Sequence, residues 1–443
     1  MKQILVLGAG KSSSALIGYL LLKAASFQWH ITVIDASLEN AKEKLKNSAF
    51  GSALSLNIED KQERINAISN ADIVISLLPP HLHSLVARDC VSLSKNLLTA
   101  SYVDDNISLL SGEIKHKQLL FLCEMGLDPG IDHMSAMQLV NNIKKEGGKI
   151  ISFKSHCGGL VTPESDDNPW HYKISWNPRN VVMAGKQGAI YKYDNNSIQL
   201  SYSELFGNSQ LLHINGHAPL SFYPNRNSLS YLPIYDLEGV KTFVRTTLRY
   251  PAFMKGWNYI ISLKLTDEAP VYETKDKSLA AFFLEHLEKN KSARWLSEDN
   301  LETEDEKSFF SQLSYLGLFD NDTIIDKGIC SAADVLQFAL EKKLALQPDD
   351  KDMIVMMHEI EYDLKGKKYK VESNLTVKGE DSQHTAMAKT VGLPLGIAAM
   401  LILEEKITLT GLHIPILPEI YEPVLAELSE MGIRFHEITK EIS

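Results

Sequence analysis

Residues 1–125 alternate short apolar runs with amphipathic segments, and this alternation restricts the possible folds more than any other feature of the chain. Apolar runs of strand length occupy 4–7, 31–34, 53–56, 72–77, 96–100 and 119–123, and helical patterns such as 13–25 and 84–93 lie between them. Strands that are regularly followed by helices are typical of a parallel sheet with helices on both faces. The sequence therefore predicts an α/β domain with a doubly wound parallel sheet.

The rest of the chain has a different pattern, which predicts two further domains. Strand-like patterns run from about Gly147 through Lys264 and return at 353–377, which favours an α+β domain with a mixed sheet. Charged helical patterns between them predict a small helical insertion, and the tail from about His384 is helical again. At 443 residues the chain is too long for one core. The expected domains are 1–126 with 392–443, 127–274 with 351–391, and 275–350.

The first predicted strand runs directly into a glycine-containing turn at the start of a helix, Gly8-Ala9-Gly10-Lys11-Ser12-Ser13. Gly8 permits a tight turn, Gly10 lets the backbone approach a phosphate, and the helix N-terminus offers free N–H groups. A dinucleotide pyrophosphate requires this setting in a Rossmann-type sheet, although Ser13 stands where the fingerprint has Gly or Ala. A P-loop ending at Ser12 is the rival interpretation, and it fails because Leu5 stands where that loop needs glycine.

Asp35 follows the second predicted strand, 25 positions after Gly10. A carboxylate there accepts hydrogen bonds from the adenine-ribose hydroxyls and repels a 2′-phosphate, whereas the structural alternative is a helix N-cap. We expect NAD as the cofactor, and Lys42 and Lys44 in the same segment leave room for NADP.

Arginine is scarce but clustered. Only eight of the 45 basic residues are arginine, and four of them (Arg179, Arg226, Arg245 and Arg249) fall within residues 179–249. Arginine binds carboxylates through two parallel hydrogen bonds, while structural ion pairs are the alternative for any single one. The cluster indicates a small-molecule substrate with several carboxylates.

The stretch CEMGLDPGIDH at 123–133 follows a strand and begins a helix, with carboxylates and a histidine close together. Asp128 before Pro129 is also typical of a capped helix start, which is the structural alternative to an acid–base site. His81 and His83 suggest a metal, but their spacing puts them on different faces of a helix and no cysteine or carboxylate completes a ligand set. We predict no metal.

Composition excludes several classes of protein. The balance of 45 Lys+Arg against 56 Asp+Glu gives a net charge of −11, which opposes binding to nucleic acid and anionic membranes. The four cysteines form no CxxC pair, and the chain shows neither a signal peptide nor a run of about 18 apolar residues. We expect a cytoplasmic protein with no nucleic-acid or membrane partner.

The motifs GLDPGIDH, CGGL with DNPWHYKISW, YPNR, TFVRTTLRY and PEIYEPVL together resemble the glutamate-forming saccharopine dehydrogenase (saccharopine reductase) family, in order and over nearly the whole chain. The resemblance implies a Rossmann domain completed by C-terminal residues, a substrate-binding and dimerisation domain, and a small helical domain. It also implies a homodimeric enzyme of lysine metabolism that interconverts saccharopine with L-glutamate and 2-aminoadipate 6-semialdehyde, using a nicotinamide cofactor.

Carried over position by position, the family's contacts fall on two sets of residues. The cofactor set is Ala9, Gly10, Lys11, Ser12, Leu77, Leu78, Ala100, Ser101, Leu127, Asp128 and Pro129, to which the motifs above add Gly8, Ser13 and Asp35. The substrate set is Ser101, Tyr102, Asp128, Arg226, Thr247, Leu248 and Arg249. Two positions depart from the family: Asp35-Ala36-Ser37 replaces a Cys-Arg-Thr-like sequence suited to NADP, and His156 replaces a tyrosine before Cys157.

Proton transfer near the substrate's secondary amine has three candidates, Asp128, Tyr102 and Cys157, and the resemblance favours Asp128 by placing it between cofactor and substrate. Two other functions remain open. One is a reductase like carboxynorspermidine or homospermidine synthase, whose polyamine substrate would favour an acidic pocket over an arginine cluster. The other is a non-catalytic NAD-sensing regulatory protein, which would need no such cluster.

Overall fold

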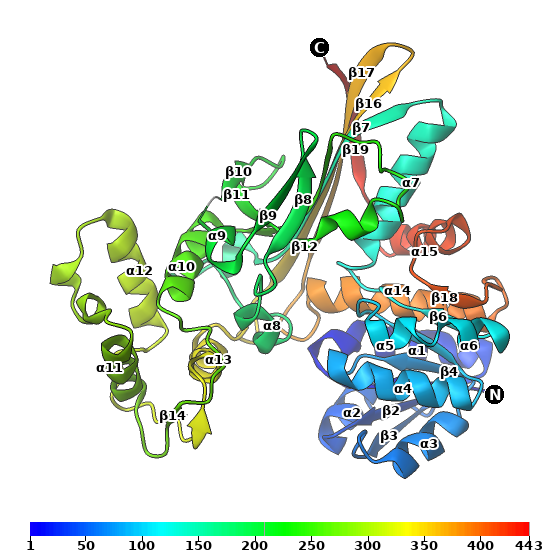
Figure 1. Ribbon diagram of the computed structural model, residues 1–443. Helices are drawn as coiled ribbons and strands as arrows, with labels where there is room; N and C mark the ends of the chain where they lie inside the picture. Colours follow the sequence, from blue (N-terminus) through cyan, green and yellow to red (C-terminus); the bar gives the residue numbers. More distant parts are fainter. Residues whose placement is uncertain (208, 443) are drawn as a thin grey trace.

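Seven parallel strands form the first sheet, in the order β18-β6-β5-β4-β1-β2-β3 (Figure 1). The computed structural model describes residues 1–207 and 209–442. The strands are β1 (Lys2–Leu7), β2 (Trp29–Asp35), β3 (Gly51–Ser55), β4 (Ile73–Ser76), β5 (Asn96–Thr99), β6 (Leu120–Leu122) and β18 (Gly411–His413). All six strands expected in residues 1–125 are present, so the prediction of a doubly wound parallel sheet is confirmed.

Helices cover both faces of this sheet because its strands are apolar on both sides. Ile4 and Val6 of β1 pack toward α1 and α14, whereas Leu5 and Leu7 pack toward α3, α4 and α6. The helices of this domain are α1 (Ser14–Phe27), α2 (Leu38–Leu45), α3 (Lys61–Ser69), α4 (Pro80–Ser92), α5 (Asp105–Ser108), α6 (Ser111–His116), α14 (Ala386–Leu403) and α15 (Pro418–Glu430).

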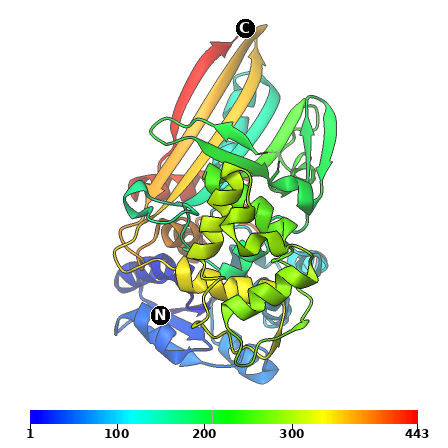
Figure 2. The ribbon, with the colours of Figure 1, turned by 90° about the vertical axis from the view of Figure 1, so that its left-hand side faces the viewer.

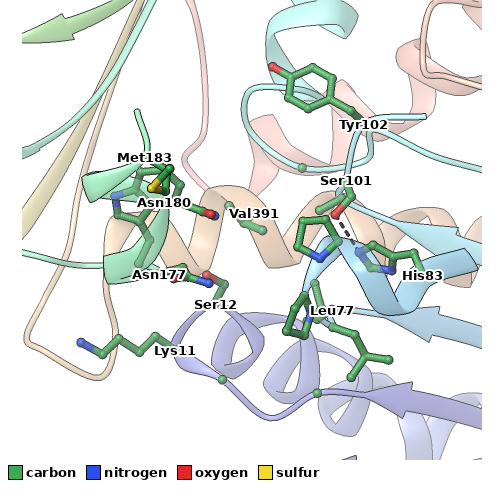
Figure 3. A pocket seen from close by; sticks show the side chains of 18 of the residues that line it. Lys11, Ser12, Leu77, His83, Ser101, Tyr102, Asn177, Asn180, Met183 and Val391 are labelled. Atoms are coloured by element: carbon green, nitrogen blue, oxygen red, sulfur yellow. Dashed lines mark hydrogen bonds between the residues drawn. The ribbon is translucent and has the colours of Figure 1, made fainter. Parts of the chain in front are cut away.

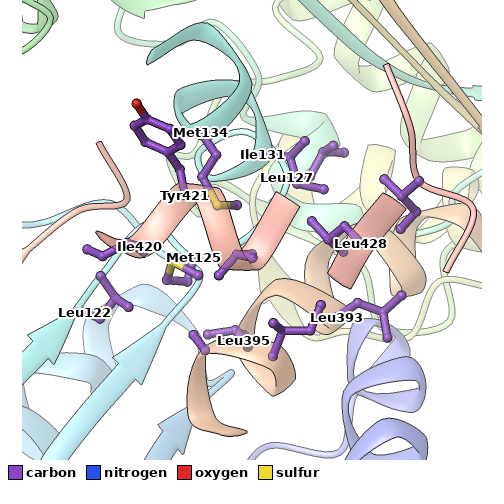
Figure 4. Close-up of a cluster of buried hydrophobic side chains, with 14 of the residues drawn as sticks. Leu122, Met125, Leu127, Ile131, Met134, Leu393, Leu395, Ile420, Tyr421 and Leu428 are labelled. Atoms are coloured by element: carbon purple, nitrogen blue, oxygen red, sulfur yellow. The ribbon is translucent and has the colours of Figure 1, made fainter. Parts of the chain in front are cut away.

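The C-terminal segment returns to this domain. β18 pairs in parallel with β6, and α14 lies against α1. Figure 4 shows the core where α14 and α15 meet the start of α7 (Ile131–Lys145), with Ile131, Leu393 and Leu428 pointing toward one another. Among the described residues, α14 is the one helix long and apolar enough to cross a membrane, and 78% of it is buried inside the protein.

The second sheet is mixed and ten-stranded, with β7 parallel to β13 and antiparallel to β16. This confirms the expected α+β domain. Its strands are β7 (Lys149–Val161), β8 (Ala189–Tyr193), β9 (Asn196–Leu200), β10 (Gln210–Leu212), β11 (Leu220–Pro224), β12 (Arg226–Asn227), β13 (Thr242–Arg249), β16 (Asp352–Leu364), β17 (Lys367–Lys378) and β19 (His436–Ile442). β19 pairs with β17, so the segment 392–443, which the sequence placed wholly in the first domain, contributes to both sheets.

A helical body lies beside the second sheet, on the left in Figure 1 and at the front in Figure 2. Its elements, with two short helices that border the sheet, are α8 (Pro178–Val182), α9 (Tyr202–Leu205), α10 (Pro251–Ser262), β14 (Tyr272–Glu273), α11 (Leu279–Lys289), α12 (Glu304–Tyr315), β15 (Ile329–Cys330) and α13 (Ala332–Lys343). The expectation of strand patterns through Lys264 was wrong for 251–262. That segment forms α10, whose Phe253 and Trp257 join one aromatic core with Trp170.

Candidate active site

A cavity of about 1380 Å³ lies between the first domain and the second, and both contribute its walls. On one side are the residues that end or follow β1, β2, β4 and β5, including Gly8, Asp35 and Leu77. On the other side are β7, β13, the α8 segment and α13. Ligands of open α/β sheets bind at the carboxyl ends of the parallel strands, so this is the expected place for a cofactor.

The glycine-containing turn has the shape that a pyrophosphate requires. Gly8 has a φ of +103°, and a Cβ there would lie 3.0 Å from the carbonyl oxygen of Leu77, so a side chain is excluded. The Ser13 hydroxyl donates a hydrogen bond of 2.8 Å to the Gly10 carbonyl and closes the turn. The 3₁₀ turn Lys11–Ser13 then leads into α1, and the space beside Gly10 is open. A phosphate could therefore reach the backbone N–H groups at the start of this helix.

Asp35 is anchored at the end of β2. Its Oδ2 accepts a hydrogen bond of 2.7 Å from the Ala9 backbone N–H, and its Oδ1 accepts one of 2.9 Å from the Ser37 N–H. The carboxylate lines the cavity together with Glu59. Within the part of the chain that the structure describes, neither of the lysines at 42 and 44 lines the cavity.

Ser101 is held by a buried histidine (Figure 3). The His83 Nε2 lies 2.8 Å from the Ser101 hydroxyl, and its Nδ1 lies 2.9 Å from the hydroxyl of Ser76. Burial lowers the pKa of His83 to about 4, so the imidazole is neutral at neutral pH. In residues 1–207 and 209–442 no group of three or more metal-binding side chains comes together, and His83 serves the two serines.

Asp128 faces the cavity and is tied to two neighbours. Its Oδ1 accepts a hydrogen bond of 2.7 Å from Nη2 of Arg245 and one of 3.4 Å from the Tyr102 hydroxyl. The same Nη2 donates to Oδ2 of Asp132, also at 2.7 Å. Burial and the negative charge of Asp132 raise the pKa of Asp128, although Arg245 acts against them. A carboxyl group with a raised pKa in a cleft is suited to proton exchange.

Two buried arginines thus have different surroundings. Arg245 is shared by two carboxylates, whereas Arg249 has no carboxylate partner among the described residues. The Arg249 Nη1 donates to the Leu248 carbonyl at 2.8 Å, its Nε has no partner, and its guanidinium lies 5.2 Å from the ring centre of Tyr172. A buried cation without a counter-ion is costly, so a ligand carboxylate in this cavity would stabilise it.

Arg226 enters the same cavity from the exposed end of the second sheet. Its guanidinium lies 4.8 Å from the ring centre of Tyr102, and its Nη1 donates to Gln187 at 3.3 Å. Burial raises the pKa of the Tyr102 hydroxyl, so Tyr102 is a donor rather than a base.

Cys157 lies on β7 beside Thr247 of β13. Both line the cavity. Burial raises the pKa of the Cys157 thiol well above its usual value, which opposes a role as a proton acceptor. The next residue is glycine because a Cβ on Gly158 would lie 2.6 Å from the Cβ of Leu248 and 2.7 Å from its carbonyl oxygen. This close approach brings the two strands, and hence Cys157 and Thr247, together.

The structure brings nearly all the predicted site residues to this one cavity, and only Ala9 and Leu248 are not on its lining. Ala9 is buried and uses its N–H on Asp35. Leu248 points to the opposite face of the sheet, because side chains alternate along β13 and its neighbours Thr247 and Arg249 face the cavity. Their individual roles stay predictions.

Sequence reasoning missed two groups of site residues. Arg245 and Asp132 stood in motifs that were recognised, but nothing in the spacing showed that they share a contact with Asp128. Asn177, Asn180 and Met183 at α8 face Ser12 across the cavity (Figure 3). No local pattern marks the α8 residues, since they reach the site only through the approach of the two domains.

Comparisons with known proteins agree with this architecture. Two family models match: the saccharopine dehydrogenase NADP binding domain over residues 4–122 and the saccharopine dehydrogenase C-terminal domain over residues 126–433. The saccharopine dehydrogenase [NADP(+), L-glutamate-forming] of Saccharomyces cerevisiae is 32% identical over 453 residues, which cover 99% of each chain. The alpha-aminoadipic semialdehyde synthase of Arabidopsis thaliana is 32% identical over 98% of this chain, which spans only 44% of that longer protein.

Solved structures give the same picture. The apo, histidine-tagged saccharopine dehydrogenase (L-Glu forming) of Saccharomyces cerevisiae superposes with a TM-score of 0.88 at 29% identity, over 99% of this chain and all of that one. The homospermidine synthase of Legionella pneumophila, solved with NAD, has a TM-score of 0.55 at 12% identity, covering 99% of this chain and 91% of the other, and shares the fold alone.

Proposed function

This chain belongs to the saccharopine dehydrogenase family, and we propose from this that it is an oxidoreductase that interconverts saccharopine with L-glutamate and 2-aminoadipate 6-semialdehyde. The observation that carries the proposal is the arrangement of charge in the cavity. Arg249, which is buried and has no carboxylate partner among the described residues, and Arg226, which is exposed, face the same space as Asp128 and the glycine-containing turn. Saccharopine offers three carboxylates and one secondary amine to these groups.

The proposed reaction is an oxidation of the secondary amine followed by hydrolysis. The carbon on the aminoadipate side of the secondary amine loses a hydride and the nitrogen loses a proton, which leaves a C=N bond. Water adds to that carbon, the C–N bond breaks, and glutamate and the semialdehyde separate. A nicotinamide dinucleotide with its pyrophosphate at the turn would supply the hydride acceptor, while the protein orients the reacting carbon and handles the protons.

Asp128 is the proton-handling group of the proposal. Its carboxylate faces the cavity, so it can stabilise the positive charge that develops on the nitrogen and accept its proton. Tyr102 and Cys157 fit this role less well, because burial raises the pKa of both and keeps them protonated. Arg226 and Arg249, which both line the cavity, hold the substrate carboxylates.

The cofactor is a nicotinamide dinucleotide. The names of the matching family model and of the yeast relative favour NADP. In this chain, however, the Asp35 and Glu59 carboxylates line the cavity near the end of β2, where they oppose a 2′-phosphate. We propose that the chain accepts NAD, with Asp35 as the residue that lowers its use of NADP.

The other functions find less support in the cavity. A polyamine would meet the guanidinium groups of Arg226 and Arg249 in the cavity, and the likeness to homospermidine synthase extends to the fold alone. A non-catalytic NAD sensor would not need a buried arginine beside its dinucleotide site. A homodimer and a cytoplasmic location also remain proposals, and light scattering and cell fractionation would test them.

The deciding assay uses the purified protein with saccharopine and either NAD or NADP, followed at the absorbance of the reduced nicotinamide. We expect reduced cofactor and equal amounts of glutamate and semialdehyde. Tight cofactor binding without any saccharopine-dependent reduction would contradict the proposed reaction.

A further inference from the structure

We propose that Arg245 and Asp132 form a positioning pair that directs Asp128 into the cavity and sets the pH at which it ionises, Arg245 by favouring the anion and Asp132 by opposing it; its catalytic meaning rests on the proposed function. The pair lies behind Asp128 and does not line the cavity itself. Both side chains are almost completely buried, with 4% of the Arg245 side chain and 2% of the Asp132 side chain exposed, against 15% for Asp128.

One guanidinium nitrogen joins the two carboxylates. Nη2 of Arg245 donates to Asp128 and to Asp132 at equal distances of 2.7 Å. Asp132 has a second donor, because its Oδ1 accepts the Gly130 backbone N–H at 2.6 Å, which fixes it at the start of α7. Asp128 has only the Tyr102 hydroxyl besides Arg245 among the described residues, so it is the less constrained of the two anions.

Other charged and titratable groups are packed around this trio, and one of them, His358 of β16, lies near Asp132 and Arg245. His133, the residue after Asp132, lies 2.8 Å from Glu124 and 2.5 Å from the hydroxyl of Tyr235. The Tyr231 hydroxyl donates to the same Glu124 oxygen at 3.0 Å.

Aromatic side chains and residues of the cavity lining also contact this trio. The ring of Tyr231 lies 4.5 Å from the Arg245 guanidinium. Tyr102, from the loop after β5, and Cys157 of β7 approach Asp128 from the cavity side.

The formal charges of the three side chains explain why Arg245 contacts two carboxylates instead of one. Two carboxylates and one guanidinium leave one net negative charge, and Asp128 is the member that faces the cavity. A single Arg245–Asp128 pair would be neutral and would stabilise a developing cation less. Two carboxylates without Arg245 could not both stay ionised so close together, so one would bind a proton.

This arrangement predicts opposite effects for two substitutions. Arg245→Gln removes the positive charge and should raise the pH at which Asp128 ionises by roughly 1–3 pH units. Asp132→Asn removes the repelling charge and frees Arg245 for Asp128, so it should lower that pH. A purely structural role predicts loss of stability in both variants and no opposed shifts.

The test follows the carboxyl carbon of Asp128 by NMR during a pH titration of the full chain labelled with ¹³C-aspartate, with Asp128→Asn to assign the signal. The matched control is Arg64→Gln, which breaks another buried arginine–aspartate pair, the 2.6 Å contact with Asp89, neither member of which lines the cavity. We expect no change in Asp128 there. Arg245→Lys should restore most of the wild-type midpoint.

Shifts in the same direction, or none, in Arg245→Gln and Asp132→Asn would overturn the proposal. If Arg245→Gln does not fold, the proposal is tested by Asp132→Asn alone, in which the pH midpoint of Asp128 ionisation should fall. The titration needs no substrate, so it gives its answer even if saccharopine is not oxidised. If it is oxidised, the acidic limb of the kcat/KM profile should move with the NMR midpoint in each variant.

Discussion

At the scale of single residues, the behaviour of each charged side chain in the cavity depends on the charged groups next to it. Asp128 keeps a raised pKa beside Asp132 and Arg245, and it should be the group whose ionisation limits the reaction at low pH. Asp128→Asn removes this charge with little change in size. We expect kcat to fall by roughly 10²–10⁴-fold, with the acidic limb of the kcat/KM profile moved or lost and NAD affinity kept. A loss below about tenfold with an unchanged profile would make Asp128 a structural cap.

Arg249 gives the second prediction at this scale. Arg249→Gln removes a buried cation that has no carboxylate partner among the described residues. Substrate binding should weaken by roughly 1.5–3 kcal/mol, and calorimetry should show NAD affinity nearly unchanged. The control is Arg179→Gln, because Arg179 pairs with Asp334 and Glu268 and does not itself line the cavity; it should leave substrate affinity intact. An equal loss of NAD affinity in Arg249→Gln would place this residue in a structural network.

Asp35 gives the third prediction at this scale, which concerns the choice between NAD and NADP. Asp35→Asn keeps an oxygen that can accept the Ala9 N–H and removes the negative charge. The ratio of kcat/KM with NADP to that with NAD should rise by roughly tenfold, because the repulsion of a 2′-phosphate is lost. Asp60→Asn, at the N-cap of α3 outside the cavity lining, is the control and should leave the ratio unchanged. An unaltered ratio in Asp35→Asn would mean that the carboxylate only anchors the turn.

At the scale of elements, the close approach of β7 to β13 sets the wall of the site. Gly158→Ala places a methyl group 2.6–2.7 Å from Leu248, and backbone must move to admit it. We expect a loss of roughly 1–3 kcal/mol in the free energy of unfolding, measured with urea. Gly18→Ala in α1, where no atom lies within 4 Å of the new Cβ, should instead be neutral or stabilising by up to about 1 kcal/mol. Equal effects would show that strand spacing is not limiting.

The elements also show what the sequence could predict. The strands of the first sheet are short apolar runs separated by helices, and such local patterns can be recognised in a sequence. The segment 251–262 was misread because Phe, Trp, Tyr and Ile favour strands by composition, whereas their buried positions follow helical spacing. β19 is exposed and charged, and an edge strand of this kind carries no signal for the sheet it will join.

The site, like the fold, has features that the sequence predicts and features that it does not. The turn at Gly8 and the residues after the strands were predictable because the topology of a parallel sheet brings strand ends together. The sharing of Arg245 between two aspartates and the approach of α8 depend on contacts between distant segments, and no local pattern encodes them.

At the scale of the whole molecule, buried histidines predict a stability that depends on pH. Burial lowers the pKa of His358 to about 4. Its Nε2 lies 2.7 Å from the Ser135 hydroxyl, while its Nδ1 has no hydrogen-bond partner among the described residues. The unfolded chain binds this proton at a pKa near 6.5, so stability should be lost as the pH falls from about 6.5 to about 4. The slope due to this residue is about 1.4 kcal/mol per pH unit. Urea unfolding at a series of pH values should show a smaller slope in His358→Gln than in the wild type, and equal slopes would contradict this assignment.

The C-terminal segment has a consequence for the order in which this protein is made. β18 closes one edge of the first sheet against β6, and β19 closes an edge of the second against β17. Both edges stay open on the ribosome until residues 411–442 have been synthesised, although the rest of each sheet is already available. A nascent chain therefore exposes two unpaired strand edges at once, and both are sites for pairing with other chains. β18 and β19 cover these two edges and become the edge strands themselves, so the inner strands of both sheets are protected only once residues 411–442 have been added.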